Sequence, residues 1–291
     1  MISAIQNKYL SVAVDSLGAQ LMSLQNSRGL EYLWQGKEPY WKNRSPVLFP
    51  FVGRLVDNTY RYCGKEYHMG IHGFAASMEF RIAEQTESSI VFELTDNEET
   101  MQQYPFAFTF RVRYTLEEKT LKMGYEVTNR DNKAMFFGLG GHPGFNVPLE
   151  EEETFEDYIL EFSQVCQPER IEFSEKVFQT GVVQPFALEN NKVMRLNRDL
   201  LQNDAIVLRN AAREVTLRST KTGRGVCMTY ADMPYVGFWH QKGYDVPYLC
   251  IEPWSTLPAR QDIVEEFTCK SDMIRLASGE CYKTTFEIKV I

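Results

Sequence analysis

Apolar and polar side chains alternate with a period of two along much of the chain, and this pattern constrains the fold more than any other feature. In the segment Phe106–Thr115, one face of an extended chain is apolar and is formed by Phe106, Phe108, Phe110, Val112 and Tyr114. A turn at Leu116–Lys119 and a second alternating segment, Leu121–Asn129, follow directly. Two such segments joined by a short turn predict a β-hairpin.

Further extended segments are predicted on both sides of this hairpin. They are Ser89–Leu94, Ala205–Leu208, Val215–Arg218, Gly225–Tyr230, Tyr235–Trp239, Tyr248–Glu252 and Tyr282–Ile291. The sequence predicts one short helix, Asp96–Gln103, with Thr95 as its N-cap and Glu98 completing a capping box. Many strands, few helices and 13% aromatic residues predict an all-β protein, a large sandwich or barrel. Because no flexible linker or fixed-period repeat is present, we expect one domain over residues 1–291.

Composition excludes several classes of function. The 291 residues carry a net charge of −8 and no cationic run, which argues against a nucleic-acid partner. No apolar run reaches the ~20 residues of a membrane span, so no membrane partner is expected. The N-terminal segment lacks the apolar stretch of a signal peptide, and the six cysteines form no CxxC pair. We therefore expect a cytoplasmic protein with reduced thiols.

The usual cofactor and metal motifs are also missing. The glycine-rich run Gly138–Gly144 fails the dinucleotide pattern, because Pro143 occupies the third glycine position. The sequence contains no phosphate-binding loop, no HExxH and no EF-hand loop. We therefore expect neither a cofactor nor a catalytic metal.

Three segments carry residues suited to chemistry. Arg54 ends the run SPVLFPFVGR, and His72 precedes a glycine at a probable turn. Arg54 either meets a carboxylate in the core or points into a cleft, and a structural hydrogen bond explains His72 equally well. His142 lies among glycines and Pro143, which fix an irregular loop of the kind that often carries function. Glu252 ends an apolar strand, and a buried carboxylate there is costly unless it is paired or useful. The simplest structural role for Glu252 is an ion pair with Arg54.

Together these segments resemble the aldose 1-epimerase (galactose mutarotase-like) family, in particular its LacX-like branch. The resemblance spans most of the chain. It runs through the motifs EYLW, SPVLFPFVGRL, HGFA, YPFAF, GGHPGFN, CIEPW and LASGE. Each fragment is short, but their number and order make the resemblance specific.

The resemblance implies a large antiparallel β-sandwich with an open sugar cleft. It implies that Glu252 is the general base and His142 the general acid of mutarotation, the exchange of α and β anomers of a free hexose. It further implies that Arg54 and His72 bind the sugar, and that Asp204 also binds it. An aspartate at a turn before a strand is the alternative reading of Asp204. The expected partner is a monosaccharide such as galactose or glucose.

Three other functions remain open at this point. A non-catalytic sugar-binding or sensing protein fits the same scaffold, and a hexose-phosphate mutarotase would need a cationic pocket for the phosphate. A glycosidase would need two paired carboxylates, and no second acidic motif like that of Glu252 stands out. The sequence names neither the sugar nor the oligomeric state.

Overall fold

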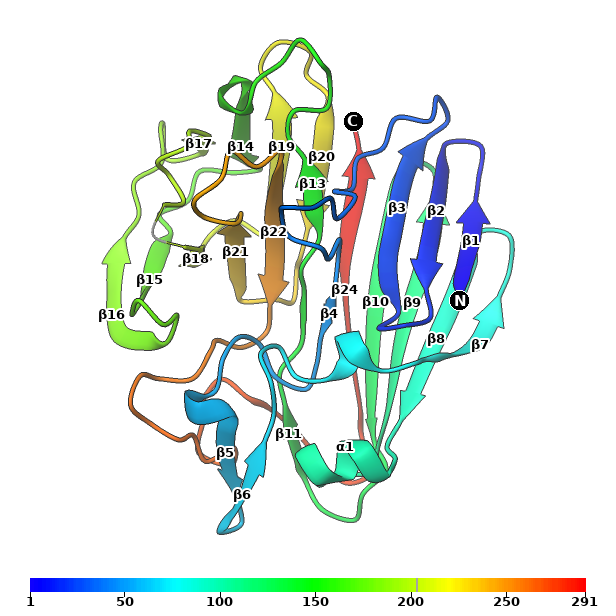
Figure 1. Ribbon diagram of the computed structural model, residues 1–291, viewed down its shortest axis with the longest axis vertical. Helices are drawn as coiled ribbons and strands as arrows, with labels where there is room; N and C mark the ends of the chain where they lie inside the picture. The colour runs from blue at the N-terminus through cyan, green and yellow to red at the C-terminus, as the bar shows by residue number, and fades with distance from the viewer. Residues whose placement is uncertain (203) are drawn as a thin grey trace.

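The computed structural model describes residues 1–202 and 204–291, and antiparallel β-sheets dominate it (Figure 1). Every pairing between named strands in these residues is antiparallel. The larger main sheet runs in the order β17 (Val193–Arg195), β14 (Tyr158–Phe162), β19 (Glu214–Ser219), β20 (Gly225–Thr229), β24 (Cys281–Val290), β10 (Thr120–Asn129), β9 (Phe108–Glu117), β8 (Ser89–Thr95) and β7 (Arg81–Gln85).

The second main sheet contains the strand that carries Glu252. It runs in the order β16 (Gln179–Pro185), β15 (Glu169–Phe173), β18 (Ile206–Arg209), β21 (Tyr235–Trp239), β22 (Tyr248–Trp254), β12 (Gly140–Gly141) and β4 (Val47–Leu48), and β13 (Gly144–Asn146) also pairs with β22. Its inner face packs on the first sheet, as the contact between Phe162 and Phe238 illustrates with ring centroids 6.3 Å apart. The two sheets therefore enclose a shared hydrophobic core.

Smaller elements complete the fold. They are the sheet of β1 (Ile2–Gln6), β2 (Leu10–Asp15) and β3 (Gln20–Asn26), the pairs β5 (Thr59–Tyr62) with β6 (Lys65–His68) and β11 (Met135–Phe137) with β23 (Ile274–Leu276), the helix α1 (Glu98–Gln103), and the 3₁₀ turns Val56–Asn58, Ala75–Ser77 and Phe155–Asp157. The Tyr114 hydroxyl donates a hydrogen bond to the Ala19 carbonyl across the core, which ties the three-stranded sheet to β9. No helix in the described part of the chain has the length and apolar character to cross a membrane.

The all-β prediction is confirmed, and so is the central hairpin. Strands β9 and β10 pair from Phe108 opposite Asn129 to Glu117 opposite Thr120. The turn is shorter than predicted, because only two residues, Glu118 and Lys119, remain outside the ladder. The alternation holds, since the apolar side chains of β9 are fully buried and its intervening residues are not.

The predicted helix exists, but its cap was wrong. Helix α1 begins at Glu98, and Asn97 is the N-cap, whose side-chain oxygen accepts a hydrogen bond from the Thr100 backbone N–H. The Thr100 hydroxyl in turn accepts one from the Asn97 N–H. Thr95 is instead the last residue of β8 and pairs with Thr109. Pairing in the sheet therefore moved the start of the helix by two residues.

Candidate active site

Strand β22 is buried on both faces. Successive side chains of a strand point to opposite faces of the sheet, so those of β22 lie alternately in two different environments. Leu249 and Ile251 point into the main core between the two sheets. Tyr248 and Cys250 belong to a separate apolar cluster on the other face. Glu252 has the same parity as these two residues, so its carboxylate lies on the face away from the main core.

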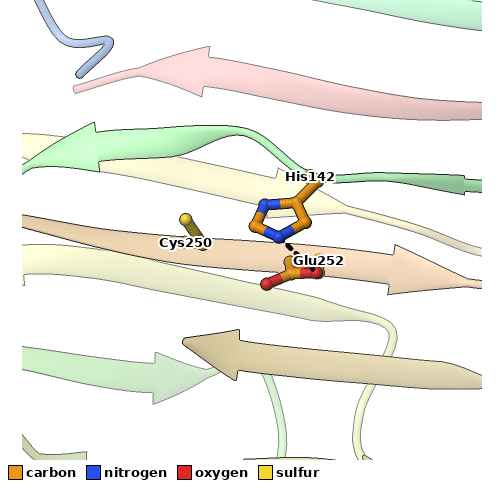
Figure 2. A group of neighbouring side chains, drawn as sticks. All are labelled: His142, Cys250 and Glu252. Carbon is orange, nitrogen blue, oxygen red and sulfur yellow. Dashed lines mark ion pairs between the residues drawn. The ribbon is translucent and has the colours of Figure 1, made fainter. Parts of the chain in front are cut away.

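The register of the sheet brings His142 opposite Glu252. Gly140 in β12 pairs with Trp254, and Gly144 in β13 pairs with Cys250. His142 lies midway between the two glycines, and Glu252 lies midway between their partners on β22. The side chains meet with 3.2 Å between His142 Nε2 and Glu252 Oε2 (Figure 2). Residues 110 positions apart thus form one pair.

Glycines on the neighbouring strands make room for this pair. Gly237 in β21 stands opposite Glu252 and leaves the cross-strand position beside the carboxylate without a side chain. A Cβ on Gly141 would lie 2.6 Å from the ring of Phe286 in β24, so only glycine fits before His142. The glycines of this loop therefore allow its backbone to pack closely against the neighbouring side chains.

Burial shifts both members of the pair toward their uncharged forms. Glu252 is 2% exposed, and burial, followed by the charge of Asp204, raises the pKa of its carboxyl well above the usual value. His142 is 7% exposed, and burial, followed by His72, lowers the pKa of its imidazole well below 6.5. Trp41 stacks on the imidazole with ring centroids 4.7 Å apart and shields it from water.

Glu252 contacts His142, and no ion pair between Glu252 and Arg54 occurs among the described residues. The simplest structural role considered for Glu252 is therefore not the one it has. Arg54 is exposed and lines a cavity of about 330 Å³ that Glu252 and His142 also line. This cavity lies within the ~300–1,000 Å³ range of small-molecule sites.

His72 lines the same cavity in a fixed orientation. Its backbone has a φ of 65°, and its backbone N–H donates to the Gly53 carbonyl. The Gly53 N–H in turn donates to His72 Nδ1 over 3.1 Å. Burial, followed by the Arg54 charge, lowers the pKa of His72 to about 4. The ring is therefore neutral near pH 7, and because Nδ1 accepts a hydrogen bond, its proton lies on Nε2.

Asp204 also reaches the cavity. It stands directly before Ala205 and β18 with a φ of 80°, and one carboxylate oxygen accepts a hydrogen bond from the Ala205 N–H. The turn-aspartate reading of its local structure therefore holds. The same side chain nevertheless borders the site, so the two readings of Asp204 are compatible.

Sequence reasoning missed several residues of the cavity wall. They include Trp41, Asn43 and Trp239. No local signal in the sequence marks Trp41 or Asn43 as part of a site. Trp239 ends the predicted strand Tyr235–Trp239, where side-chain direction decides its role. Such residues become visible only when the strands are paired.

A second, more open hollow of about 920 Å³ adjoins the cavity. Arg54, Val177 and Asp204 line both spaces. The ionisable residues around the second hollow are Arg54, Lys176 and Lys242 against Asp57, Glu175, Asp204 and Asp262, which is three cations against four carboxylates. This hollow is therefore not a cationic pocket.

Comparison with known proteins identifies the family. The family described as aldose 1-epimerase matches residues 1–288. The chromosomal LacX protein of Lactococcus lactis subsp. lactis is 35% identical over 303 residues, which covers all of both chains. A galactose mutarotase related enzyme from Lactobacillus acidophilus has a TM-score of 0.96 at 34% identity, covering 100% of this chain and 97% of that one. A galactose mutarotase-like protein from Lactobacillus casei ATCC 334 has a TM-score of 0.95 at 29% identity, with both chains fully covered. The chain therefore belongs to the aldose 1-epimerase family.

Proposed function

We propose that the protein is an aldose 1-epimerase that interconverts the α and β anomers of a free hexose. The observation that carries this proposal is the buried His142–Glu252 pair, 3.2 Å apart on the wall of a cavity of about 330 Å³. Mutarotation needs one group that removes the proton of the anomeric hydroxyl and one that protonates the ring oxygen. The two groups exchange roles when the ring closes on the other face of the carbonyl.

In this proposal Glu252 takes the proton from the anomeric hydroxyl and His142 gives a proton to the ring oxygen. In each half-reaction the pair accepts one proton and gives one proton, so its total number of protons does not change. A pair that holds a single proton can therefore catalyse both ring opening and ring closure. Burial disfavours separated charges on the free pair, because it raises the pKa of Glu252 and lowers that of His142. Sugar hydroxyls that donate to the carboxylate would favour its ionised form when substrate binds.

Three further residues would hold the sugar. His72 presents an Nε2–H donor on a ring fixed by Gly53, so it suits a sugar oxygen. Arg54 offers up to five N–H donors, and Asp204 offers acceptors at the mouth of the cavity. The near balance of charge in the adjoining hollow favours a neutral hexose over a hexose phosphate. No step of this reaction calls for a cofactor.

Polarimetry on freshly dissolved α-galactose and α-glucose tests the proposal. We expect Glu252→Gln to lose about 10²–10⁴-fold in turnover, the usual contribution of a positioned acid–base group, while sugar binding persists. Glu87→Gln, at an exposed glutamate, is the control and should retain wild-type rates. Saturable sugar binding by the wild type without faster anomer exchange would instead identify a sugar-binding or sensing protein.

We also propose that the protein acts in the cytoplasm. All six cysteines, at positions 63, 166, 227, 250, 269 and 281, are free, and three of them are exposed. Unpaired exposed thiols suit a reducing compartment. Fractionation of the source cells, followed by detection with an antibody, tests this location.

A further inference from the structure

The third side chain of Figure 2 has no role in the proposed reaction. Cys250 lies two residues before Glu252 on β22 and therefore on the same face. A ring nitrogen of His142, Cys250 Sγ and a carboxylate oxygen of Glu252 all lie within 4.8 Å of one another. All three residues are buried. Imidazole, thiolate and carboxylate together are a ligand set typical of zinc and of similar divalent transition metals.

The other ring nitrogen of His142 has no partner of its own in the described part of the chain. His142 Nδ1 is buried and has no hydrogen-bond partner among residues 1–202 and 204–291. In Figure 2 this nitrogen lies on the Cys250 side of the ring, while Nε2 faces Glu252. An unsatisfied buried polar atom typically costs ~1–3 kcal/mol. A cation held between His142 and Glu252 would bind Nε2, so Nδ1 would carry the ring proton and stay outside the coordination.

We propose that His142, Cys250 and Glu252 form a binding site for a zinc-like divalent cation that inhibits the enzyme. Zinc bond lengths of ~2.0–2.3 Å in a tetrahedral site place ligand atoms roughly 3.3–3.6 Å apart. The His142–Glu252 separation of 3.2 Å already fits this geometry. The three ligand atoms lie within 4.8 Å of one another, and where Cys250 Sγ lies farther away than the tetrahedral separation it moves closer to complete the site. The adjoining cavity leaves a fourth position for water.

Charge and proton balance are consistent with such a site. Binding of Zn²⁺ displaces the proton of the Cys250 thiol and the proton shared by His142 and Glu252, and both protons pass to solvent. The ion, a thiolate, a carboxylate and a neutral imidazole then sum to zero charge, which suits a buried position. The metal occupies both groups of the proposed acid–base pair, so metal binding and mutarotation exclude each other. Only this inhibition rests on the proposed function; the binding itself does not.

Cobalt(II) spectroscopy on the full-length chain tests the site, because a bound thiolate gives near-ultraviolet charge-transfer absorption. The parent protein should carry Cys63→Ser, Cys269→Ser and Cys281→Ser, which removes the exposed thiols as adventitious ligands. We expect one equivalent of Co²⁺ to give this absorption and Zn²⁺ to displace it. Cys250→Ser should abolish the absorption and weaken Zn²⁺ binding by more than the ~10–100-fold typical of outer-shell partners.

Cys227→Ser is the matched control, because Cys227 is half-buried on β20, outside the cluster, and should leave the spectrum unchanged. Absence of the absorption in the parent, or its survival in Cys250→Ser, would overturn the metal site. Turnover of the chelator-treated parent tests the proposed function separately. If that turnover is present, Zn²⁺ should inhibit the parent and spare the turnover of Cys250→Ser at the same concentration. Equal inhibition of the two would refute inhibition through this site.

Discussion

Glu252 is a carboxyl group placed where a carboxyl group is costly. It is 2% exposed, and the side chain that it contacts is a histidine whose own charge is disfavoured by burial. A stable fold gains nothing from this arrangement, because an amide or an apolar side chain would fill the position with less desolvation. The cost is consistent with a side chain retained for chemistry.

The desolvation of Glu252 predicts a stability effect with a definite sign. Because burial raises the pKa of the folded-state carboxyl, its contribution is most favourable below the unfolded-state pKa and becomes unfavourable as pH rises. Glu252→Gln should therefore stabilise the fold increasingly from pH 5 to pH 8, by on the order of 1 kcal/mol for each unit of pKa shift. Urea unfolding at both pH values measures this difference. A difference that stays constant or falls with pH would contradict the burial argument.

The same pKa directions predict the pH dependence of turnover. The pair is active with one proton, so activity falls at low pH when it takes up a second one. Because burial lowers the pKa of His142 below 6.5, the acidic limb of kcat/KM should be centred below pH 6.5. Neutral His72, with a pKa of about 4, leaves the plateau near pH 7 unaffected. Initial-rate polarimetry from pH 4 to pH 9 measures the profile, and an acidic limb centred above pH 6.5 would argue against this pair.

At the scale of elements, the strands were easier to predict than the helix. Tyr235–Trp239 has the predicted bounds, and β22 extends two residues beyond its predicted end. A strand is marked by alternation over several residues, whereas a short helix depends on a cap of one or two residues. Asp96 precedes the helix, and its carboxylate accepts a hydrogen bond from the Phe108 N–H, which keeps this residue with the sheet.

The cap at Asn97 gives a prediction for stability. Asn97→Ala removes the acceptor for the Thr100 N–H and should destabilise the fold by about 1 kcal/mol. Asn97→Ser keeps a capping oxygen and should remain close to the wild type. Denaturant unfolding of the three proteins measures the difference. Equal losses in both variants would show that Asn97 acts through something other than its cap.

At the scale of the whole molecule, the active site depends on the other main sheet. Gly141, which precedes His142, sits directly over Phe286 in β24. Phe286 also packs edge-to-face on Tyr125 of β10, with centroids 5.7 Å apart. The larger sheet thus supports the loop that carries the proposed acid. One cluster of buried residues extends from Ile5 to Val290. A single domain over 1–291 stays a prediction.

A substitution of Phe286 should therefore change the rate of the proposed reaction as well as the stability of the fold. Phe286→Leu should destabilise the fold by about 1–2 kcal/mol, because it removes part of a buried ring. It should also lower kcat with little change in KM, because the loop that carries His142 loses the side chain on which it packs. Phe92→Leu is the control, since Phe92 is equally buried but packs against Tyr114 in the larger sheet. It should lose similar stability and keep its kcat. Matching losses of kcat in the two variants would refute a specific role for Phe286.

The sequence by itself determined the strands, through a period of two, and the identity of the chemical side chains, through short motifs. It did not determine that His142 faces Glu252, because that contact depends on the register by which β12 and β13 meet β22. Nor did it place Cys250 beside them or Trp41 over the imidazole. The preference of a segment for a strand or a helix depends on its own residues. The register between two strands depends on which whole face of the sheet is buried, and no short segment determines that.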